Sequence, residues 1–476
     1  MSTATRSSGL FVDGGWRPAA GRIPVLDKYS GEVVAEIAAA TEPDVKDAIA
    51  GAHAASSRPL EPAERARVLE TVAGLLDARA GEFVADYVAE TGFTTADARN
   101  ELRRAASIYR LSAQEALRIA GEQVPLSATP GSENRLAFTV RVPVGVVVAI
   151  APFNAPLSTV AHKIGPAIAA GNAVVLKPAE KTPLSALNVV QAFADAGLPP
   201  GFLQLVCASG SAIGSALLDD DRVRFYTFTG STAVGRVISA GAGLARTHLE
   251  LGSNSVSIVA ADARLDDVVR LVATAGFRKA GQVCTSVQRI LVDESRFDDL
   301  TTALAERVKA LTAGDPRAEG TDLGPLIAES EAARAEEWVS RSAARLRVGG
   351  ERNGSVLTPA LLADPAPESE VLSKEIFAPV VSVVPVRDFD EAIARVNEGR
   401  YGLQAGVFTQ DLDRAFHAAR ELRVGGVMIN DTSSYHADAM PYGGVKDSGH
   451  GVEGPRYAVE DMTDPRIVVL NLHRPE

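Results

Sequence analysis

Short apolar runs alternate with segments of helical periodicity from residue 144 onward, and this alternation is the strongest constraint on the fold. Continuous apolar runs of this length are typical of parallel strands that are covered on both faces, with crossover helices between them. The first part of the pattern therefore predicts a doubly wound α/β domain. Its strands are expected in VGVVVAIAP (144–152), NAVVLKP (172–178), FLQLVC (202–207) and RFYTFTG (224–230).

A second alternating series begins after residue 250 and predicts a second α/β domain, which would meet the first at a cleft. Two helices are expected in this series, at about 265–280 and about 295–312. Residues 315–370 are rich in Gly, Pro, Ala and Glu, and we expect surface loops and a helix there. The strands of this domain are expected in SVSIVA (255–260), RILVD (289–293), VVSVVPV (380–386) and GVMIN (426–430).

The first third of the chain is predicted to be helical, because residues 42–57 and 62–92 carry apolar side chains at spacings of three and four. A chain of 476 residues is too long for one ordinary hydrophobic core, so several compact units are expected. The formal net charge is −12 and no long basic run is present, which argues against nucleic acid as a partner. No apolar run approaches the roughly 20 residues of a membrane span or has the pattern of a signal peptide. We therefore expect a cytoplasmic protein that does not enter a membrane.

Two cysteines, Cys207 and Cys284, are present, and in a reducing compartment both are expected to be thiols. Cys207 follows an apolar run and is interpreted as a core thiol. Cys284 lies in GQVCTSVQRI (281–290), after a glycine and among small and polar neighbours. The seven histidines include no HExxH motif, and no CxxC pair occurs, so no metal site is predicted.

Three residue types needed for acyl chemistry on an aldehyde occur along the chain: Asn154 in APFNAP, Glu250 in LELG, and Cys284. A thiolate can attack a carbonyl, an amide N–H can stabilise the resulting oxyanion, and a carboxylate can activate water against a thioester. Each residue taken alone also has a structural interpretation. A free cysteine is more often buried and inert, an asparagine between prolines is often a turn residue, and a glutamate is often a surface acid.

A nucleotide site is predicted where two of the strands end. Lys177 and Glu180 follow the strand in VVLKPAE and suit the hydroxyls of a ribose, while Gly230 and Ser231 in FTGSTAVG open a turn before a helix. The alternatives are a solvated strand end for Lys177 and an ordinary glycine turn at Gly230.

Taken together, these motifs resemble the aldehyde dehydrogenase superfamily over almost the whole chain, from LFVDGGWRP (10–18) to DPRIVVLNL (464–472). The other matching motifs include KEIFAPV, YGLQAGVFT and MPYGGVKDSG. The resemblance implies an α/β aldehyde dehydrogenase fold with three parts and assembly as a homodimer or homotetramer. These parts are a Rossmann-like NAD-binding domain (1–122 and 143–251), a catalytic domain (252–450) and a small β oligomerisation arm (123–142 and 451–476). The apolar RIVVLNL would be an edge strand that pairs with another subunit.

The same resemblance implies a role for each site residue. Cys284 becomes the nucleophile, Glu250 the general base, and the Asn154 amide shares the oxyanion hole with the Cys284 backbone N–H. For the cofactor, Lys177 and Glu180 face the adenosine ribose, Gly230 and Ser231 the pyrophosphate, and Glu375 and Phe377 the nicotinamide ribose and ring. Further positions match residues that line the cofactor cleft: Ile150, Phe153, Gly210, Gly214, Phe228 and Val234.

NAD is the expected cofactor, because Glu180 would repel the 2′-phosphate of NADP. NADP stays possible, since Lys177 and Lys181 are close in the sequence. Relatives that transfer the acyl group to coenzyme A generally lack the glutamate found at 250, so hydrolysis to a free acid is favoured. A coenzyme A-acylating enzyme and a non-catalytic protein that retains the fold are the alternatives.

The substrate is expected to be a small polar or anionic aldehyde. Several motifs look closest to the branch that contains the lactaldehyde, non-phosphorylating glyceraldehyde-3-phosphate and phosphonoacetaldehyde dehydrogenases. Candidate groups for an anion are Arg103 or Arg104, His162, Arg289 and His436. Against this, Arg289 occurs in most relatives whatever their substrate, and Arg104 also fits a solvated helix face. Ala155 departs from the family pattern, which has an aromatic residue after the asparagine.

Overall fold

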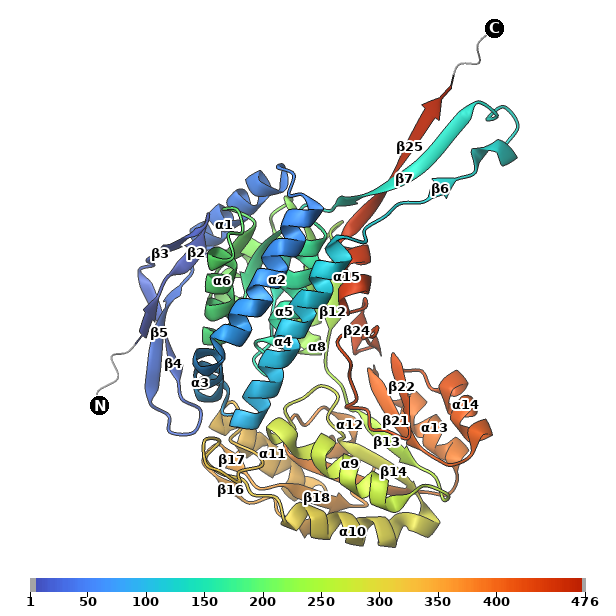
Figure 1. The fold of residues 1–476 in the computed structure, drawn as a ribbon. Helices are drawn as coiled ribbons and strands as arrows, with labels where there is room; N and C mark the ends of the chain where they lie inside the picture. The colour runs from blue at the N-terminus through green and yellow to red at the C-terminus, as the bar shows by residue number, and fades with distance from the viewer. Residues whose placement is uncertain (1–5, 473–476) are drawn as a thin grey trace.

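The computed structural model describes residues 6–472, apart from the side chains of residues 6–8, 346 and 347. The outer limits of the predicted NAD-binding domain and oligomerisation arm, residues 1 and 476, lie outside this range. The chain forms two α/β bodies and a projecting arm (Figure 1).

An eight-stranded sheet organises the first body, in the order β24-β12-β11-β8-β9-β10-β2-β3. Its five central strands run parallel, and apolar side chains fill their interiors because helices cover both faces. The chain passes from β8 to β9 on one side and later returns to β11 on the other side of β8. Sheets of this type bind ligands at such a switch point, beyond the carboxyl ends of the strands. The strands are β2 Leu10–Val12, β3 Gly15–Arg17, β8 Val146–Ile150, β9 Ala173–Lys177, β10 Leu203–Leu205, β11 Val223–Thr229, β12 Arg246–Glu250 and β24 Gly449–His450.

Helices on the two faces of this sheet confirm the helical periodicity of the first third and of the crossovers. α5 is buried along its whole length and forms the centre of the body. The helices are α1 Glu42–Ser56, α2 Pro62–Ala78, α3 Ala80–Thr91, α4 Thr95–Ala116, α5 Ser158–Ala169, α6 Leu184–Asp195, α7 Gly210–Leu218 and α8 Thr232–Gly241.

The prediction of a helical first third was incomplete, because strands precede α1. Besides β2 and β3, a three-stranded sheet contains β1 Arg6–Ser8, β4 Gly21–Leu26 and β5 Val33–Ala39. β4 buries only Val25 and leaves its other residues exposed or partly exposed, which gives little apolar signal in the sequence.

The second body contains a seven-stranded sheet in the order β15-β18-β19-β14-β13-β21-β22, and its predicted strands are present. The expectation of surface loops and a helix at 315–370 is confirmed for the helix, α11 Glu329–Arg341, but it missed the strands in this range. β18 is a fully buried sheet strand, and its four residues are too short a run to be recognised from periodicity. The strands are β13 Val256–Val259, β14 Arg289–Asp293, β15 Arg345–Val348, β18 Ala360–Ala363, β19 Val380–Val386, β21 Gln404–Phe408 and β22 Gly426–Ile429.

Helices and shorter elements complete the second body. The helices are α9 Leu265–Phe277, α10 Phe297–Lys309, α11 Glu329–Arg341, α12 Glu370–Ser373, α13 Phe389–Glu398 and α14 Leu412–Glu421. The shorter elements are an irregular turn at Arg278–Gly281, a 3-10 turn at Glu294–Arg296 and the strands β16 Arg352–Asn353, β17 Val356–Leu357, β20 Tyr401–Gly402 and β23 Val445–Lys446.

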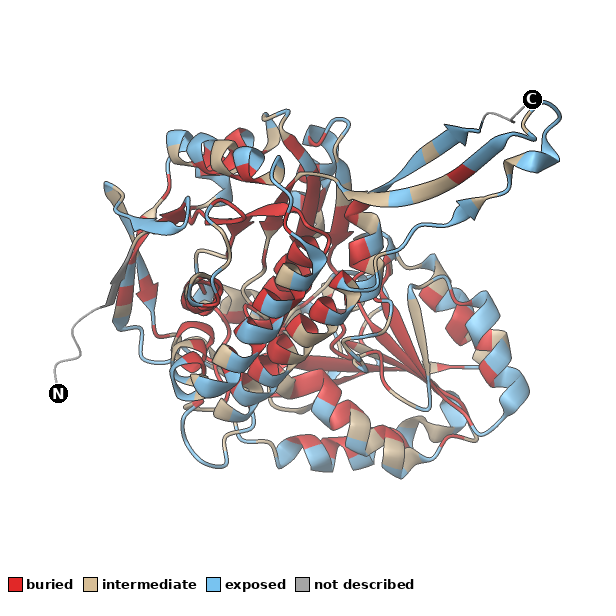
Figure 2. Ribbon diagram, turned by 45° about the horizontal axis from the view of Figure 1, so that its top comes forward, coloured by how far each residue is buried: buried red, intermediate tan, exposed pale blue. Residues whose placement is uncertain are grey.

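The arm is a three-stranded antiparallel sheet that projects from the bodies (Figure 1). It contains β6 Gln123–Val124, β7 Arg135–Pro143 and β25 Thr463–Asn471, and a 3-10 turn at Leu126–Ala128 lies between β6 and β7. β25 follows α15 Pro455–Asp461 and pairs with β7 along its whole length. It is the edge strand of the sheet, and its outer edge has no partner strand among residues 6–472. Figure 2 shows that the arm is mostly exposed, whereas both sheets are buried.

Within the described range, no helix combines the length and the apolar character that crossing a bilayer requires.

Candidate active site

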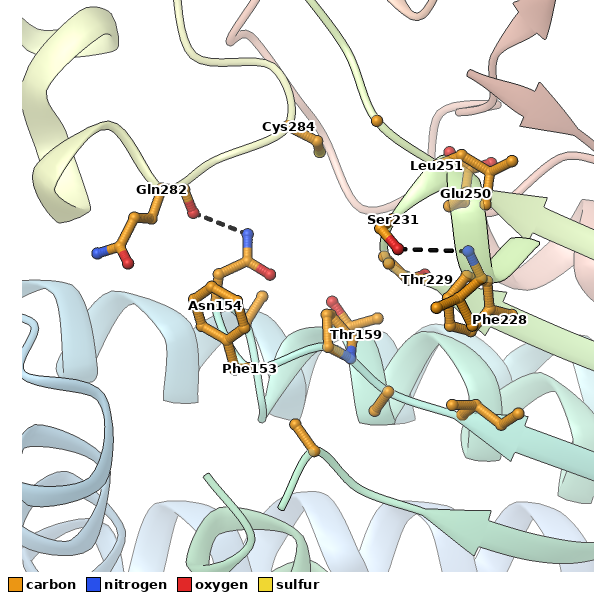
Figure 3. A pocket seen from close by; sticks show the side chains of 18 of the residues that line it. Phe153, Asn154, Thr159, Phe228, Thr229, Ser231, Glu250, Leu251, Gln282 and Cys284 are labelled. Atoms are coloured by element: carbon orange, nitrogen blue, oxygen red, sulfur yellow. Dashed lines mark hydrogen bonds between the residues drawn. The ribbon is translucent and has the colours of Figure 1, made fainter. Parts of the chain in front are cut away.

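A cleft of about 980 Å³ lies where the carboxyl ends of the first sheet face loops of the second body. Figure 3 shows Asn154 and Glu250 on the side of the first body and Cys284 on a loop opposite them. All of the predicted catalytic and cofactor residues line this cleft: Ile150, Phe153, Asn154, Lys177, Glu180, Gly210, Gly214, Phe228, Gly230, Ser231, Val234, Glu250, Cys284, Glu375 and Phe377.

The loop that carries Cys284 begins with a left-handed turn. α9 ends at Phe277, earlier than the sequence predicts, because Lys279 and Ala280 both have φ of 52°. Each non-glycine residue in this conformation costs about 1–2 kcal/mol. Gly281 continues the turn at φ 69°, and a Cβ there would overlap the backbone carbonyl of Ala378. The glycine of the GQVC motif is therefore required by the close approach of a neighbouring backbone.

Contacts between the two bodies hold this strained turn. The buried Lys279 ammonium lies 2.8 Å from Glu101 Oε2 of α4 and donates a 3.1 Å hydrogen bond to the backbone oxygen of Asn154. In the other direction, Asn154 Nδ2 donates a 2.8 Å hydrogen bond to the backbone oxygen of Gln282 (Figure 3). An amide carries two N–H groups, so the second is left for a ligand beside Cys284.

Cys284 is partly exposed to the cleft, and its Sγ lies 2.9 Å from the hydroxyl of Tyr442. Burial raises the pKa of the thiol to about 12, with further increases from the charges of Glu250 and Glu375, while the Tyr442 hydrogen bond acts in the opposite direction. The resting thiol is therefore protonated, and its proton must leave when it attacks a carbonyl. Cys207 is only 1% exposed and belongs to the core, as the sequence predicts.

Glu250 is buried at the end of β12, and one carboxyl oxygen lies 3.1 Å from His248 Nε2. The other oxygen, Oε2, has no hydrogen-bond partner among the described residues. Burial raises the pKa of Glu250, the charge of Glu453 raises it further, and Lys163 opposes both. A buried carboxyl with a raised pKa and an unoccupied oxygen, facing a cleft, has the properties of a general base.

A buried ion pair next to Glu250 was missed by the sequence predictions. Lys163 Nζ lies 3.3 Å from Glu453 Oε1 and 3.1 Å from Thr227 Oγ1. Although burial raises the pKa of Glu453, the charge of Lys163 and three neighbouring histidines lower it to about 2. The available signal was the lysine itself, because a charged residue within the fully buried α5 requires a partner.

Three of the proposed substrate residues line the cleft, namely Arg104, His162 and His436, whereas Arg103 and Arg289 do not. Adjacent residues of a helix point about 100° apart, so Arg103 is exposed on α4 when Arg104 faces the cleft. Arg289 instead donates a 3.0 Å hydrogen bond from Nη2 to the backbone oxygen of Asn254. The predictions for Arg103 and Arg289 are thus corrected: one faces solvent and the other supports a loop.

We call Arg104, His162, His436 and Asp438 the polar cluster. Arg104 Nη2 lies 2.8 Å from Asp438 Oδ1 and 3.0 Å from His436 Nδ1, so its charge is balanced within the protein. Burial and the charge of Arg104 lower the pKa of His436 to about 3, which leaves this ring neutral. His162 is 4% exposed, and neither ring nitrogen has a hydrogen-bond partner among the described residues. The cluster therefore offers buried polar groups to the cleft without an unpaired cation.

The remaining cleft residues fit a dinucleotide. Lys177 lies at the end of β9, and its ammonium makes a long hydrogen bond of 3.3 Å to the Pro178 oxygen, which leaves donors for a ribose. Gly210 and Gly214 have open space where a side chain would be, as a backbone needs when it approaches a ligand closely. Ser231 caps α8, because its side-chain oxygen accepts a hydrogen bond from the Val234 N–H (Figure 3), and both residues line the cleft at the N-terminus of this helix.

Residues of the second body close the other end of this groove. Glu375 accepts a 2.9 Å hydrogen bond from the Ser253 N–H, and burial raises its pKa to about 7. The ring of Phe377 meets that of Phe153 edge to face, with centroids 5.8 Å apart. Within residues 6–472, no group of three His, Cys, Asp or Glu side chains could hold a metal ion.

Comparison with known proteins agrees with this geometry. The model of the aldehyde dehydrogenase family matches residues 16–468. The chain belongs to the aldehyde dehydrogenase family. This confirms the predicted family, its α/β fold and the prediction of an oxidoreductase that acts on aldehydes.

Relatives of this dehydrogenase include enzymes named for small polar aldehydes. The 3-sulfolactaldehyde dehydrogenase of Priestia aryabhattai is 47% identical over 473 residues, which cover 99% of each chain. The lactaldehyde dehydrogenase of Methanococcus vannielii is 35% identical over 472 residues, covering 97% of this chain and 100% of the relative. A solved structure, the NADP-dependent glyceraldehyde-3-phosphate dehydrogenase from Bacillus halodurans complexed with NADP, has a TM-score of 0.95 and 37% identity, covering 98% and 100% of the two chains.

The two thiols of the dehydrogenase should differ in reactivity. We expect iodoacetamide to alkylate Cys284 at a rate that rises with pH, because its pKa is raised, and to leave Cys207 unmodified in the folded protein. Peptide mass spectrometry would measure both sites. Cys284→Ala should lose labelling and activity together, and comparable labelling of Cys207 would contradict the assignment.

The contact between Lys279 and Glu101 should be important for stability. Glu101→Gln leaves a buried ammonium without its counter-charge, and we expect a loss of about 3–5 kcal/mol in the free energy of unfolding, measured with urea. Although burial raises the pKa of Glu101, the charges of Lys279 and Arg104 lower it from 4.5 to about 2, so this stabilisation is present at neutral pH and disappears as the pH falls through that interval. Arg103→Gln, on the exposed face of the same helix, is the control and should change stability by less than about 0.5 kcal/mol. Equal effects of the two variants would contradict the prediction.

Proposed function

We propose that this dehydrogenase oxidises a small polar aldehyde to the free carboxylic acid, with Cys284 as nucleophile, Asn154 in the oxyanion hole and Glu250 as general base. The observation that carries the proposal is their convergence. A partly exposed thiol, an amide with an uncommitted N–H and a carboxyl oxygen without a partner line one cleft.

The chemistry follows from these groups. The Cys284 thiol gives up its proton to water in the cleft, and the sulfur attacks the carbonyl carbon. The oxyanion of the thiohemiacetal accepts hydrogen bonds from the Asn154 amide and the Cys284 backbone N–H. When bound, NAD(P)⁺ supplies an acceptor for the hydride of that carbon, so the cysteine is left as a thioester. Glu250 then takes a proton from water, the resulting hydroxide adds to the thioester, and the acid leaves as the thiolate is regenerated.

Residues of the first body would hold the cofactor. Lys177 and Glu180 would bind the hydroxyls of the adenosine ribose, and the N-terminus of α8 at Ser231 would face the pyrophosphate. We propose NAD as the preferred cofactor, because a 2′-phosphate would meet the carboxylate of Glu180. The NADP complex of the glyceraldehyde-3-phosphate dehydrogenase supports the use of this fold with NADP as the alternative cofactor.

The substrate is proposed to be a small aldehyde with polar substituents, and 3-sulfolactaldehyde is the first to test. The name of the Priestia relative supports this choice, as does the polar cluster that borders the cleft. Because Asp438 already balances Arg104, we expect N–H groups of Arg104, His162 and His436 to bind the substituent by hydrogen bonds.

We also propose that the enzyme assembles as a homodimer or homotetramer through the arm formed by residues 123–142 and the segment after 451. Within residues 6–472 no strand pairs with the outer edge of β25, and apolar side chains on this strand are exposed at Ile467, Val469 and Leu470. Natural proteins cover such an edge, and a strand of another subunit is suited to do so.

The proposed activity can be tested by NADH formation over a panel of 3-sulfolactaldehyde, lactaldehyde, hexanal and benzaldehyde, with and without coenzyme A. We expect the two small polar aldehydes to have the highest kcat/KM, no requirement for coenzyme A, and a higher kcat/KM with NAD than with NADP. A requirement for coenzyme A would identify an acylating enzyme instead. Absence of turnover with every aldehyde would leave the non-catalytic alternative.

Removal of the base should separate hydride transfer from hydrolysis. Glu250→Gln is expected to lower the steady-state rate about 10²–10⁴-fold while a stoichiometric burst of NADH remains, because the thioester still forms. In the unmodified enzyme, the rate of hydrolysis should fall as the pH decreases, because protonated Glu250 cannot act as a base. Since the pKa of Glu250 is raised, this fall should begin at a pH above the ordinary pKa of a carboxyl group. Stopped-flow absorbance measures both phases. Glu70→Gln, at an exposed position of α2, should change neither phase, and loss of the burst in Glu250→Gln would contradict the role.

A further inference from the structure

Tyr442 places a hydroxyl directly at the nucleophile. Its oxygen lies 2.9 Å from Cys284 Sγ, and the residue is only 8% exposed. The backbone of Tyr442 is fixed by two hydrogen bonds, because its N–H donates to the Glu453 oxygen at 3.1 Å and its oxygen accepts from the Glu453 N–H at 2.6 Å. The ring also meets His436 edge to face, with centroids 4.9 Å apart. The hydroxyl therefore has a defined position.

Attack on an aldehyde changes what this hydroxyl can bond to. Once Sγ carries a C–S bond it has lost its proton, and the sulfur that remains is a thioether, which is only a weak acceptor. A buried hydroxyl without a partner is unfavourable, so Tyr442 then needs an acceptor from the bound substrate. The oxyanion is already provided with donors in the proposed mechanism, namely the Asn154 amide and the Cys284 backbone N–H.

The next polar atom of the substrate that can lie beside Sγ is a substituent on C2, the carbon bonded to the carbonyl carbon. A hydroxyl at this position is both acceptor and donor, and it stands close to the new C–S bond. The Tyr442 ring packs against His436, which in turn contacts Arg104 and the ring of His162. An aldehyde with a hydroxyl on C2 and a polar group on C3 would therefore meet polar side chains along its length.

We propose that Tyr442 is a specificity-determining residue that hydrogen-bonds the C2 hydroxyl of the substrate and selects 2-hydroxyaldehydes over aldehydes without this hydroxyl. The inference rests on the proposed function and assigns the substrate class more narrowly. Because a substrate without the C2 hydroxyl leaves the buried Tyr442 hydroxyl unpaired, we expect discrimination of at least about tenfold.

Lactaldehyde and propionaldehyde test the proposal, since they have the same carbon skeleton and differ only in the C2 hydroxyl. The kcat/KM of each is measured for the unmodified enzyme and for Tyr442→Phe. We expect the variant to lose about tenfold or more with lactaldehyde and less than about twofold with propionaldehyde. The ratio of kcat/KM for lactaldehyde to kcat/KM for propionaldehyde is compared between the unmodified enzyme and the variant. This comparison cancels the intrinsic difference in reactivity and hydration of the two aldehydes.

A second measurement needs no cofactor. Formation of the thiohemiacetal should protect Cys284 from iodoacetamide, and lactaldehyde should protect the unmodified enzyme at lower concentration than it protects Tyr442→Phe. The labelling rate without aldehyde reports whether the variant keeps its folded site. Tyr109→Phe is the matched control, because it removes a buried hydroxyl that has no partner among the described residues and lies outside the residues that line the cleft.

The outcomes separate this proposal from the proposed function. Suppose that the unmodified enzyme oxidises both aldehydes and that Tyr442→Phe lowers kcat/KM equally for lactaldehyde and propionaldehyde. The tyrosine then acts on the thiol, and the proposed selection of 2-hydroxyaldehydes is overturned. An unchanged ratio and unchanged protection would overturn it as well. If the unmodified enzyme oxidises no aldehyde, the proposed function itself fails.

Discussion

The contact of Lys279 with Glu101 and Asn154 is the interaction on which the geometry of the site depends. It joins the loop of Cys284 in the second body to α4 and to the loop after β8 in the first body. The same lysine has a left-handed backbone, which is unfavourable for a residue with a side chain. A buried ion pair can hold such a conformation because its partners are costly to separate once water is excluded. The position of Cys284 relative to Asn154 thus follows from an interaction between the bodies.

Two neighbouring buried carboxyl groups show how the surroundings determine which one can act as a base. Glu250 and Glu453 are both out of solvent, but Lys163 lies against Glu453 and lowers its pKa, whereas the pKa of Glu250 is raised by burial and by its negative neighbour. The charged form of Glu453 is therefore fixed near neutral pH, and the protonation of Glu250 can change during a reaction. Lys163 donates its hydrogen bonds to Thr227 and Glu453 and not to Glu250, so the pKa values of the two carboxyl groups move in opposite directions.

Much of this could be predicted from the sequence, because the relevant information is local. Buried parallel strands appear as apolar runs, and residues that follow such strands, such as Lys177 and Ser231, come together at one edge of the sheet. The neighbours of Cys284 alone also allowed an inert thiol, and its predicted role as nucleophile came from the resemblance of its motif to the family. The positions of Asn154, Glu250 and Cys284 along one cleft agree with their predicted roles, which stay predictions until variants are measured.

What could not be predicted depends on pairing between distant segments. Asp438 lies far from Arg104 in the sequence, so nothing local showed that this arginine has its charge balanced. Arg103 and Arg104 are equivalent by composition, and only the orientation of α4 distinguishes them. β18 was missed because four residues carry no usable periodicity, and its burial comes from strands on either side.

The bridge between Tyr442 and Glu453 has a consequence for the end of the chain. After Glu453 the backbone passes directly into α15 and then into β25, so one short continuous segment runs from the partner of Tyr442 into the arm. Loss of β25 would uncover the edge of β7 with which it pairs, while Glu453, just before α15, holds the backbone of the residue whose hydroxyl contacts Cys284 Sγ. The proposed assembly surface and the candidate site are therefore joined by one stretch of polypeptide.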